Sequence, residues 1–117
     1  MAVVTFFFLQ NNSVDQRFKS CSQGYRRLLK DLVDSQLHEN HYLIIRLKER
    51  YIQALMKLQH EASSNGEKRE LLDEQIKIFG QIKRVMLRVD PQSQMWNETW
   101  EKMQRDRRNL DDRSELC

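Results

Sequence analysis

The chain has few of the residues that interrupt helices. Its 117 residues include one proline and three glycines. Folds rich in sheet or loop need many more turn residues than this. A charged fraction of 32% beside a hydrophobic fraction of 39% is typical of long amphipathic helices. The sequence therefore predicts a single all-α domain over residues 1–117.

Cysteine is also scarce, and no secretory signal is evident. Cys21 and Cys117 are too few for a disulfide framework and lack the CxxC spacing of zinc sites. The apolar run 2–9 lacks a charged leading region and has about half the length needed to span a bilayer. We therefore expect an intracellular protein, in the cytoplasm or the nucleus, without a membrane span.

No segment is strongly charged with one sign. The chain has 20 basic and 17 acidic residues, whereas a nucleic-acid binder usually concentrates its basic residues on one face or tail. Some basic residues nevertheless flank the expected first helix: Lys19, Arg26, Arg27, Lys30, Arg46, Lys48 and Arg50. They support an alternative hypothesis, a helical module that binds nucleic acid or nucleoprotein.

Recognisable catalytic motifs are missing. The sequence has no glycine-rich phosphate loop, no GxSxG elbow and no isolated pair of carboxylates. His38 and His41 could share a helical face and bind a metal ion, but no third ligand is evident nearby. We predict that the protein is not an enzyme and has no cofactor and no metal site.

The first twelve residues form an apolar arm that includes Phe6, Phe7 and Phe8. Residues 2–9 are β-branched and aromatic, and such a segment aggregates when it stays exposed. Either the body of the protein or a partner must cover it. We assign the three phenylalanines to partner binding.

A long or broken helix is expected over residues 13–62. Ser13 and Gln16 have the spacing of a capping box, and no Gly or Pro between residues 34 and 41 forces a break. Apolar residues follow with heptad spacing: Phe18, Tyr25, Leu28, Leu32, Ile44, Leu47, Tyr51, Leu55 and Leu58. We call these nine residues the seam and assign them to assembly with other chains.

Two further helices are expected over residues 67–89 and 92–111. The turn at 62–66 should end the first long segment, with Gly66 in a left-handed conformation. Asp90 and Pro91 should end the next helix, with Pro91 opening the last one. The last helix presents Trp96, Trp100 and Met103 on one face, which we assign to partner docking, with packing against residues 67–89 as the alternative.

One short stretch resembles a known motif. Tyr25-Arg26-Arg27-Leu28-Leu29-Lys30 is similar to the start of the motif of the mitochondrial LYR accessory proteins, which are small, basic and three-helical. Gly24 stands where that motif has its leading leucine, and the phenylalanine expected downstream is missing. Because of these two differences, we assign no functional role of that family's residues to residues of this chain.

Together these patterns predict an elongated helical hairpin or a three- to four-helix bundle. The expected function is that of a scaffold or adaptor that binds other proteins, as a homo-oligomer or as a subunit of a larger complex.

Overall fold

The computed structural model describes residues 13–38 and 41–116, with side chains as far as residue 111. The chain forms four helices, α2 (Val14–Asp34), α3 (Tyr42–Glu61), α4 (Asn65–Val89) and α5 (Met95–Leu116), and no described residue is in a strand. The predicted all-α bundle is confirmed. The predicted arm over residues 1–12, with Phe6, Phe7 and Phe8, lies outside the described residues.

Helix α2 begins and ends with side-chain and backbone caps. The Ser13 hydroxyl accepts a hydrogen bond from the Gln16 amide at 3.2 Å, as the capping pattern predicted. At the other end Gln36 has a φ of 67°, and the Leu37 amide donates to the Leu32 carbonyl at 3.3 Å. This is a Schellman ending with glutamine in the position that glycine usually takes. It breaks the 13–62 segment into two helices.

Helix α3 begins at one of the two histidines that the sequence singled out. The Nδ1 atom of His41 accepts a hydrogen bond from the Leu43 amide at 3.1 Å, so His41 is the N-cap of α3. His41 thus satisfies an amide that the first turn of the helix leaves without a partner.

The other two helix boundaries differ from the prediction by a few residues. Ser64 caps α4 by accepting from the Glu67 amide at 3.1 Å. The role predicted for Gly66 is wrong, because this residue lies in the first turn of α4 and has no positive φ. Pro91 does not open the last helix either, since α5 begins only at Met95.

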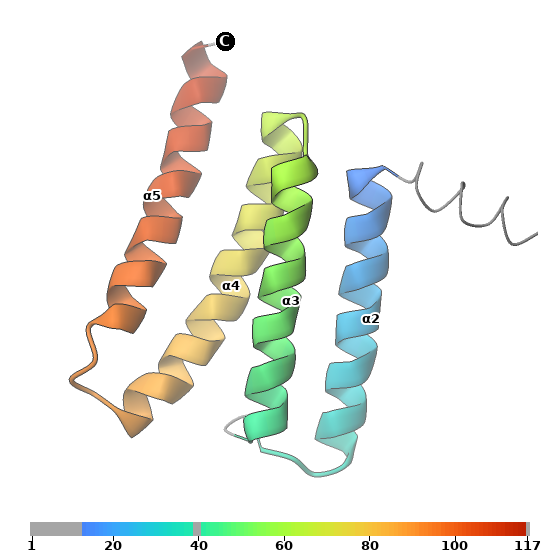
Figure 1. Cartoon of the computed structure of the whole chain (residues 1–117), viewed down its shortest axis with the longest axis vertical. Helices are drawn as coiled ribbons and strands as arrows, with labels where there is room; N and C mark the ends of the chain where they lie inside the picture. Colours follow the sequence, from blue (N-terminus) through green and yellow to red (C-terminus); the bar gives the residue numbers. More distant parts are fainter. Residues whose placement is uncertain (1–12, 39–40, 117) are drawn as a thin grey trace, which may run out of the picture.

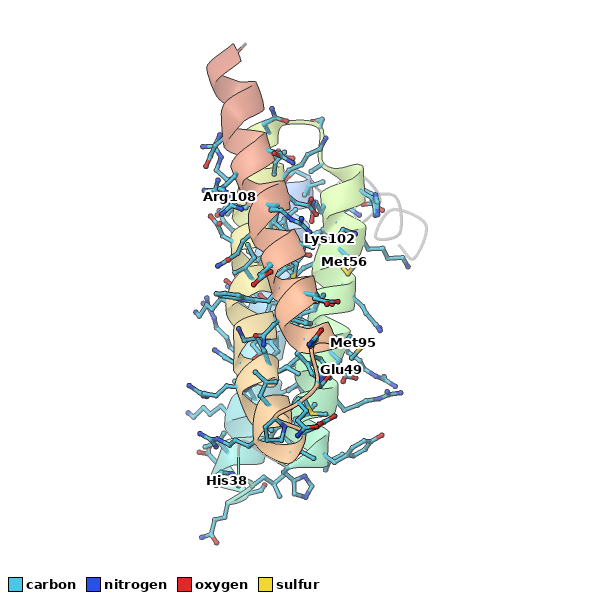
Figure 2. All side chains as sticks on the ribbon, turned by 90° about the vertical axis from the view of Figure 1, so that its left-hand side faces the viewer. His38, Glu49, Met56, Met95, Lys102 and Arg108 are labelled. Carbon is cyan, nitrogen blue, oxygen red and sulfur yellow. The ribbon has the colours of Figure 1, made fainter. Side chains whose placement is uncertain are left out.

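The four helices lie side by side in chain order and run alternately up and down (Figure 1). Helix α3 packs against α2 and α4, and α2 also touches α4. Helix α5 packs against α4 alone: no Cα atom of α5 lies within 8 Å of a Cα atom of α2 or α3. The molecule is broad in Figure 1 and narrow in Figure 2.

The core lies between α2, α3 and α4. Its largest fully buried side chains are Ile44, Leu55, Leu71 and Ile82. In contrast, no residue of α5 is buried among those whose burial is described. The fold is therefore a three-helix core with a fourth helix attached along one side. No helix in the described parts of the chain is long and apolar enough to cross a membrane.

Candidate protein-binding groove

A groove runs between α3 and α5, with α4 as its floor. It exists because α5 packs on α4 without reaching α3. Three hollows follow one another along it, of about 190, 410 and 200 Å³. The first and second share Ile52 and Phe79, and the second and third share Leu72. The hollows therefore form one continuous groove.

The groove has the length of a short helix. Along α5 it extends from Trp96 to Leu110, which corresponds to about 21 Å at 1.5 Å per residue. This is about four turns of helix. The central hollow alone has a volume within the range of ordinary ligand sites, roughly 300–1,000 Å³.

The lining of the central hollow is largely apolar. Its apolar side chains come from all three helices: Ile52, Met56, Leu72, Phe79 and Met103. Met56 is 48% exposed, and Figure 2 shows it beside Lys102, with Glu49 and Met95 further along toward the start of α5. Methionine adapts to partners of different shape because its side chain is unbranched and polarizable.

Two glutamines form a hydrogen-bonded pair on the floor of this hollow. The side-chain amide of Gln75 donates a hydrogen bond to the Gln59 carbonyl oxygen at 2.7 Å, and Gln75 is only 3% exposed. The bond joins α4 to α3 and satisfies an amide group whose burial would otherwise be costly. The floor of the groove is therefore held in place from both helices.

The two tryptophans hold α5 against α4. The Trp96 ring lies 5.7 Å from the Phe79 ring, centroid to centroid. The Trp100 ring carries the Lys83 ammonium group 3.9 Å above its centroid, a cation–π contact. Trp100 also lies close to the α4 backbone, because a Cβ atom added at Gly80 would be 3.4 Å from the indole nitrogen. Both tryptophans are half-buried, as the alternative of packing against residues 67–89 anticipated.

Ion pairs join the start of α4 to the end of α5. The Arg107 guanidinium lies 2.6 Å from Asp73 of α4 and 2.6 Å from Asp111 of its own helix. Asp111 in turn lies 3.1 Å from Arg69. Hydrogen bonding to Arg107 holds the pKa of the Asp111 carboxyl below its usual value. These pairs fix the end of α5 where the apolar contacts become sparse.

Most of the seam lies inside the single chain. Tyr25 and Tyr51 stack with ring centroids 4.0 Å apart, and burial raises the pKa of Tyr25 to about 12. Further seam residues belong to or pack against the core of the same chain: Phe18, Ile44, Leu47, Leu55 and Leu58. Leu32 is half-buried. Leu28, by contrast, is 54% exposed, so it is the seam residue most open to a partner.

One of the basic residues of the nucleic-acid hypothesis is not available to a partner. Lys48 is 6% exposed, and it continues the buried line of Ile44, Tyr51 and Leu55 at spacings of 4, 3 and 4. Arg46 pairs with Glu49 at 3.8 Å and lies on the outer face of α3 by helical register. The spacing of the apolar residues around Lys48 was the signal that it belongs to the core.

His38 and His41, the two histidines that could have shared a metal ion, have no further ligands beside them in the described residues. In the described ranges, no group of three or more His, Cys, Asp and Glu side chains is arranged to hold a metal ion. His41 instead caps α3 through its Nδ1 atom. Because that nitrogen accepts a hydrogen bond, it is not open to a metal while the cap is made.

Two residues on which the groove depends were not predicted from the sequence. Met56 and Phe79 line it together with the predicted Met103. Met56 lies outside the seam, and no residue of α4 was assigned to partner binding. The only sequence signal was an apolar residue beside the seam on α3 and on α4, which widens the apolar stripe of each helix. A wider apolar stripe on α3 and α4 does not indicate how much of it α5 covers.

None of the family models, curated proteins and solved structures compared with this chain matches it significantly. The function proposed below is therefore inferred from the groove and the residues around it.

Proposed function

We propose that this chain is a non-enzymatic interaction subunit that holds the apolar face of a helix from a partner protein in the α3–α5 groove. One observation carries this proposal: a groove about four helical turns long stays open beside a well-packed core, and its first two hollows are mainly apolar. An amphipathic helix binds in such a groove through apolar residues of its own that are spaced three and four apart.

The charges at the rim favour an apolar ligand over a strongly charged one. The charged residues that line the first two hollows are of both signs: Glu49 and Asp106 are acidic, and Lys102 is basic. With both signs present, the rim gives little attraction to a polyanion. A partner helix would instead gain affinity by removing Met56 and its apolar neighbours from water.

The free thiol of Cys21, which is half-buried, agrees with a reducing compartment. On this basis we place the binding activity inside the cell, as part of a larger assembly of proteins.

A designed peptide tests this proposal on the full chain. The probe is a fluorescent 14-residue amphipathic helix with leucines at spacings of three and four, and its control has the same composition in scrambled order. Fluorescence anisotropy should show saturable binding of the amphipathic peptide only. Met56→Lys should weaken it at least about tenfold, because a charge in the hollow must be desolvated, whereas Leu28→Lys on α2 should leave it unchanged.

The same titration distinguishes binding of a partner helix from the alternative, binding of nucleic acid. Peptide binding should change little between low and high salt, since it depends on apolar contacts. Equal binding of the two peptides, or equal loss in both variants, would contradict the proposed function. Tighter binding of a 14-nucleotide single strand, with affinity that falls steeply with salt, would favour the alternative.

A further inference from the structure

The two walls of the α3–α5 groove give a preferred direction to a helix bound between them. From the hollow at one end to the hollow at the other, α3 runs from Glu49 to Gln59. Over the same distance α5 runs from Trp96 to Leu110, so the two walls are parallel to each other and α4, the floor, is antiparallel to both (Figure 1). A partner helix that runs in the direction of α4 would be antiparallel to each wall. It would complete an up-and-down four-helix bundle with α3, α4 and α5.

The helix dipoles favour the same direction. The N-terminus of a helix carries a partial positive charge and its C-terminus a partial negative charge. Helix α3 ends at Glu61, two residues after Gln59, which lines the last hollow. An antiparallel partner helix would therefore begin beside the negative end of α3. The Asp106 carboxylate lines the same hollow and adds to the attraction.

Three charged side chains line the groove in a defined order. Asp106 lines the central and the last hollow, at the end where the partner helix would begin. Lys102 lies one helical turn before it on α5 and lines the central hollow. Glu49 lines the hollow at the opposite end together with Trp96, ten residues before Asp106 on α5. That separation is about 15 Å, or about three helical turns.

Two of these three charges have no partner of their own. Lys102 and Asp106 are both exposed, and neither takes part in an ion pair among the described residues. Glu49 has the Arg46 guanidinium 3.8 Å away, so its charge is partly balanced and should contribute least. The sign of the charge thus alternates along the groove, with the two unpaired charges at the end where a partner helix would begin.

From this arrangement we infer that the groove accepts an amphipathic helix of another protein, antiparallel to α3 and α5. This helix carries a basic residue in its first turn, an acidic residue one turn later and a basic residue in its last turn, opposite Asp106, Lys102 and Glu49 in that order. The inference rests on the proposed function, because it specifies the partner of the same groove. Complementary charges across an interface set register and specificity more than affinity. The rim would therefore select among helices that fill the apolar hollows equally well.

Two peptides of identical composition and net charge test the charge order on the full chain. Both have 14 residues, with leucines at spacings of three and four, and the matched peptide carries the basic, acidic and basic residues in the inferred order. The second peptide exchanges the first two charges. The wild-type chain should prefer the matched peptide, whereas Lys102→Glu combined with Asp106→Lys should prefer the exchanged one. The ratio of the two affinities should change by about tenfold between the proteins, and this change should shrink at high salt.

The design separates rim charges from other effects. A difference in intrinsic helicity between the peptides is the same for both proteins and cancels in the change of the ratio. Glu101→Arg combined with Arg105→Glu is the matched control, because it exchanges two charges one turn apart on α5 that line none of the three hollows. This control should keep the wild-type ratio.

A nitroxide label on the matched peptide tests the direction. A label at its N-terminus should broaden the methyl signals of Leu110, which lines the last hollow. A label at its C-terminus should instead broaden the methyl signal of Met95 at the start of α5. The opposite pattern would overturn the inference.

Failure of the inference can be told apart from failure of the proposed function. Equal affinity ratios in the wild-type chain and the rim variant would overturn the inference, while saturable binding of either peptide would leave the proposed function standing. If neither protein binds either peptide, the proposed function fails, and the inference fails with it.

Discussion

Helices α2 and α5 lie at opposite edges of the molecule, and the two are held in different ways. Helix α2 contacts both α3 and α4 and buries Tyr25 and Ser22 in the core. Helix α5 contacts α4 alone and buries none of its described residues completely. The comparison shows how an open surface arises in a bundle, because a helix held by one neighbour leaves a groove on its free side.

The largest effect should come from the core that α2 shares. Leu55 is fully buried, so Leu55→Ala should lower the free energy of unfolding by about 2–5 kcal/mol, measured by chemical denaturation followed by circular dichroism. Leu28→Ala is the matched control and should cost no more than about 0.5 kcal/mol. A large cost at Leu28 would instead place this residue in an interface between chains, as the seam hypothesis proposed.

Removing Trp96 should loosen α5 and leave the core folded. Trp96→Ala deletes the contact with the Phe79 ring and should cost about 2 kcal/mol, less than the 3–5 kcal/mol typical of a fully buried tryptophan. Hydrogen exchange should show faster exchange along α5 and unchanged protection in α3. If α3 and α5 lose protection together, the distinction between a core and an attached helix is wrong.

A smaller effect is expected from the ion pairs at the end of α5. The lowered pKa of Asp111 means that the folded state favours its charged form. The resulting contribution to the stability of the folded state is fully present above the pKa of an unfolded aspartate, about 3.9. It is lost as the pH falls through the lower pKa that Asp111 has in the folded chain. The protection factors of amides near the end of α5, which compare each exchange rate with that of an unstructured amide at the same pH, should fall in that acidic range. Asp111→Asn should lower these protection factors at neutral pH as well. Equal protection in both proteins at neutral pH would exclude a role for the pair.

The smallest effect is expected at the turn between α2 and α3. Gln36 has a φ of 67°, which costs an L-residue energy that glycine does not pay. Gln36→Gly should raise the free energy of unfolding by about 0.5–1 kcal/mol. Ser35→Gly, next to it at a φ of −78°, should not stabilise the chain. Equal effects at the two positions would argue against the left-handed ending.

The elements that local signals specify were predictable from the sequence. Ser13 capped α2 as expected, and Asp90 and Pro91 follow the end of α4. The end of α2 could not be placed, since the left-handed residue that follows it, Gln36, is a glutamine. Gly66 was assigned a role that it does not have. Backbone conformation at such positions depends on the packing of the helices on either side, which no local pattern reports.

The groove was less predictable than the helices. The heptad spacing of the seam identified most of the residues that are buried in α3. It did not indicate whether they pack against another chain or against a neighbouring helix of the same chain. Trp96 illustrates this, because its apolar area was compatible both with partner docking and with packing against residues 67–89, and its observed contact is Phe79. The open side of α5 follows from the packing of three helices together.

The most direct test of the central claim is to follow the methionine methyl spectrum of the full chain while the amphipathic peptide is added. Because Met56 and Met103 line the groove, we expect their signals to shift progressively, while the signal of Met86, which packs against the core, stays constant. Shifts of Met86 alone, or no shifts at saturating peptide, would contradict the assignment of the α3–α5 groove as the binding surface.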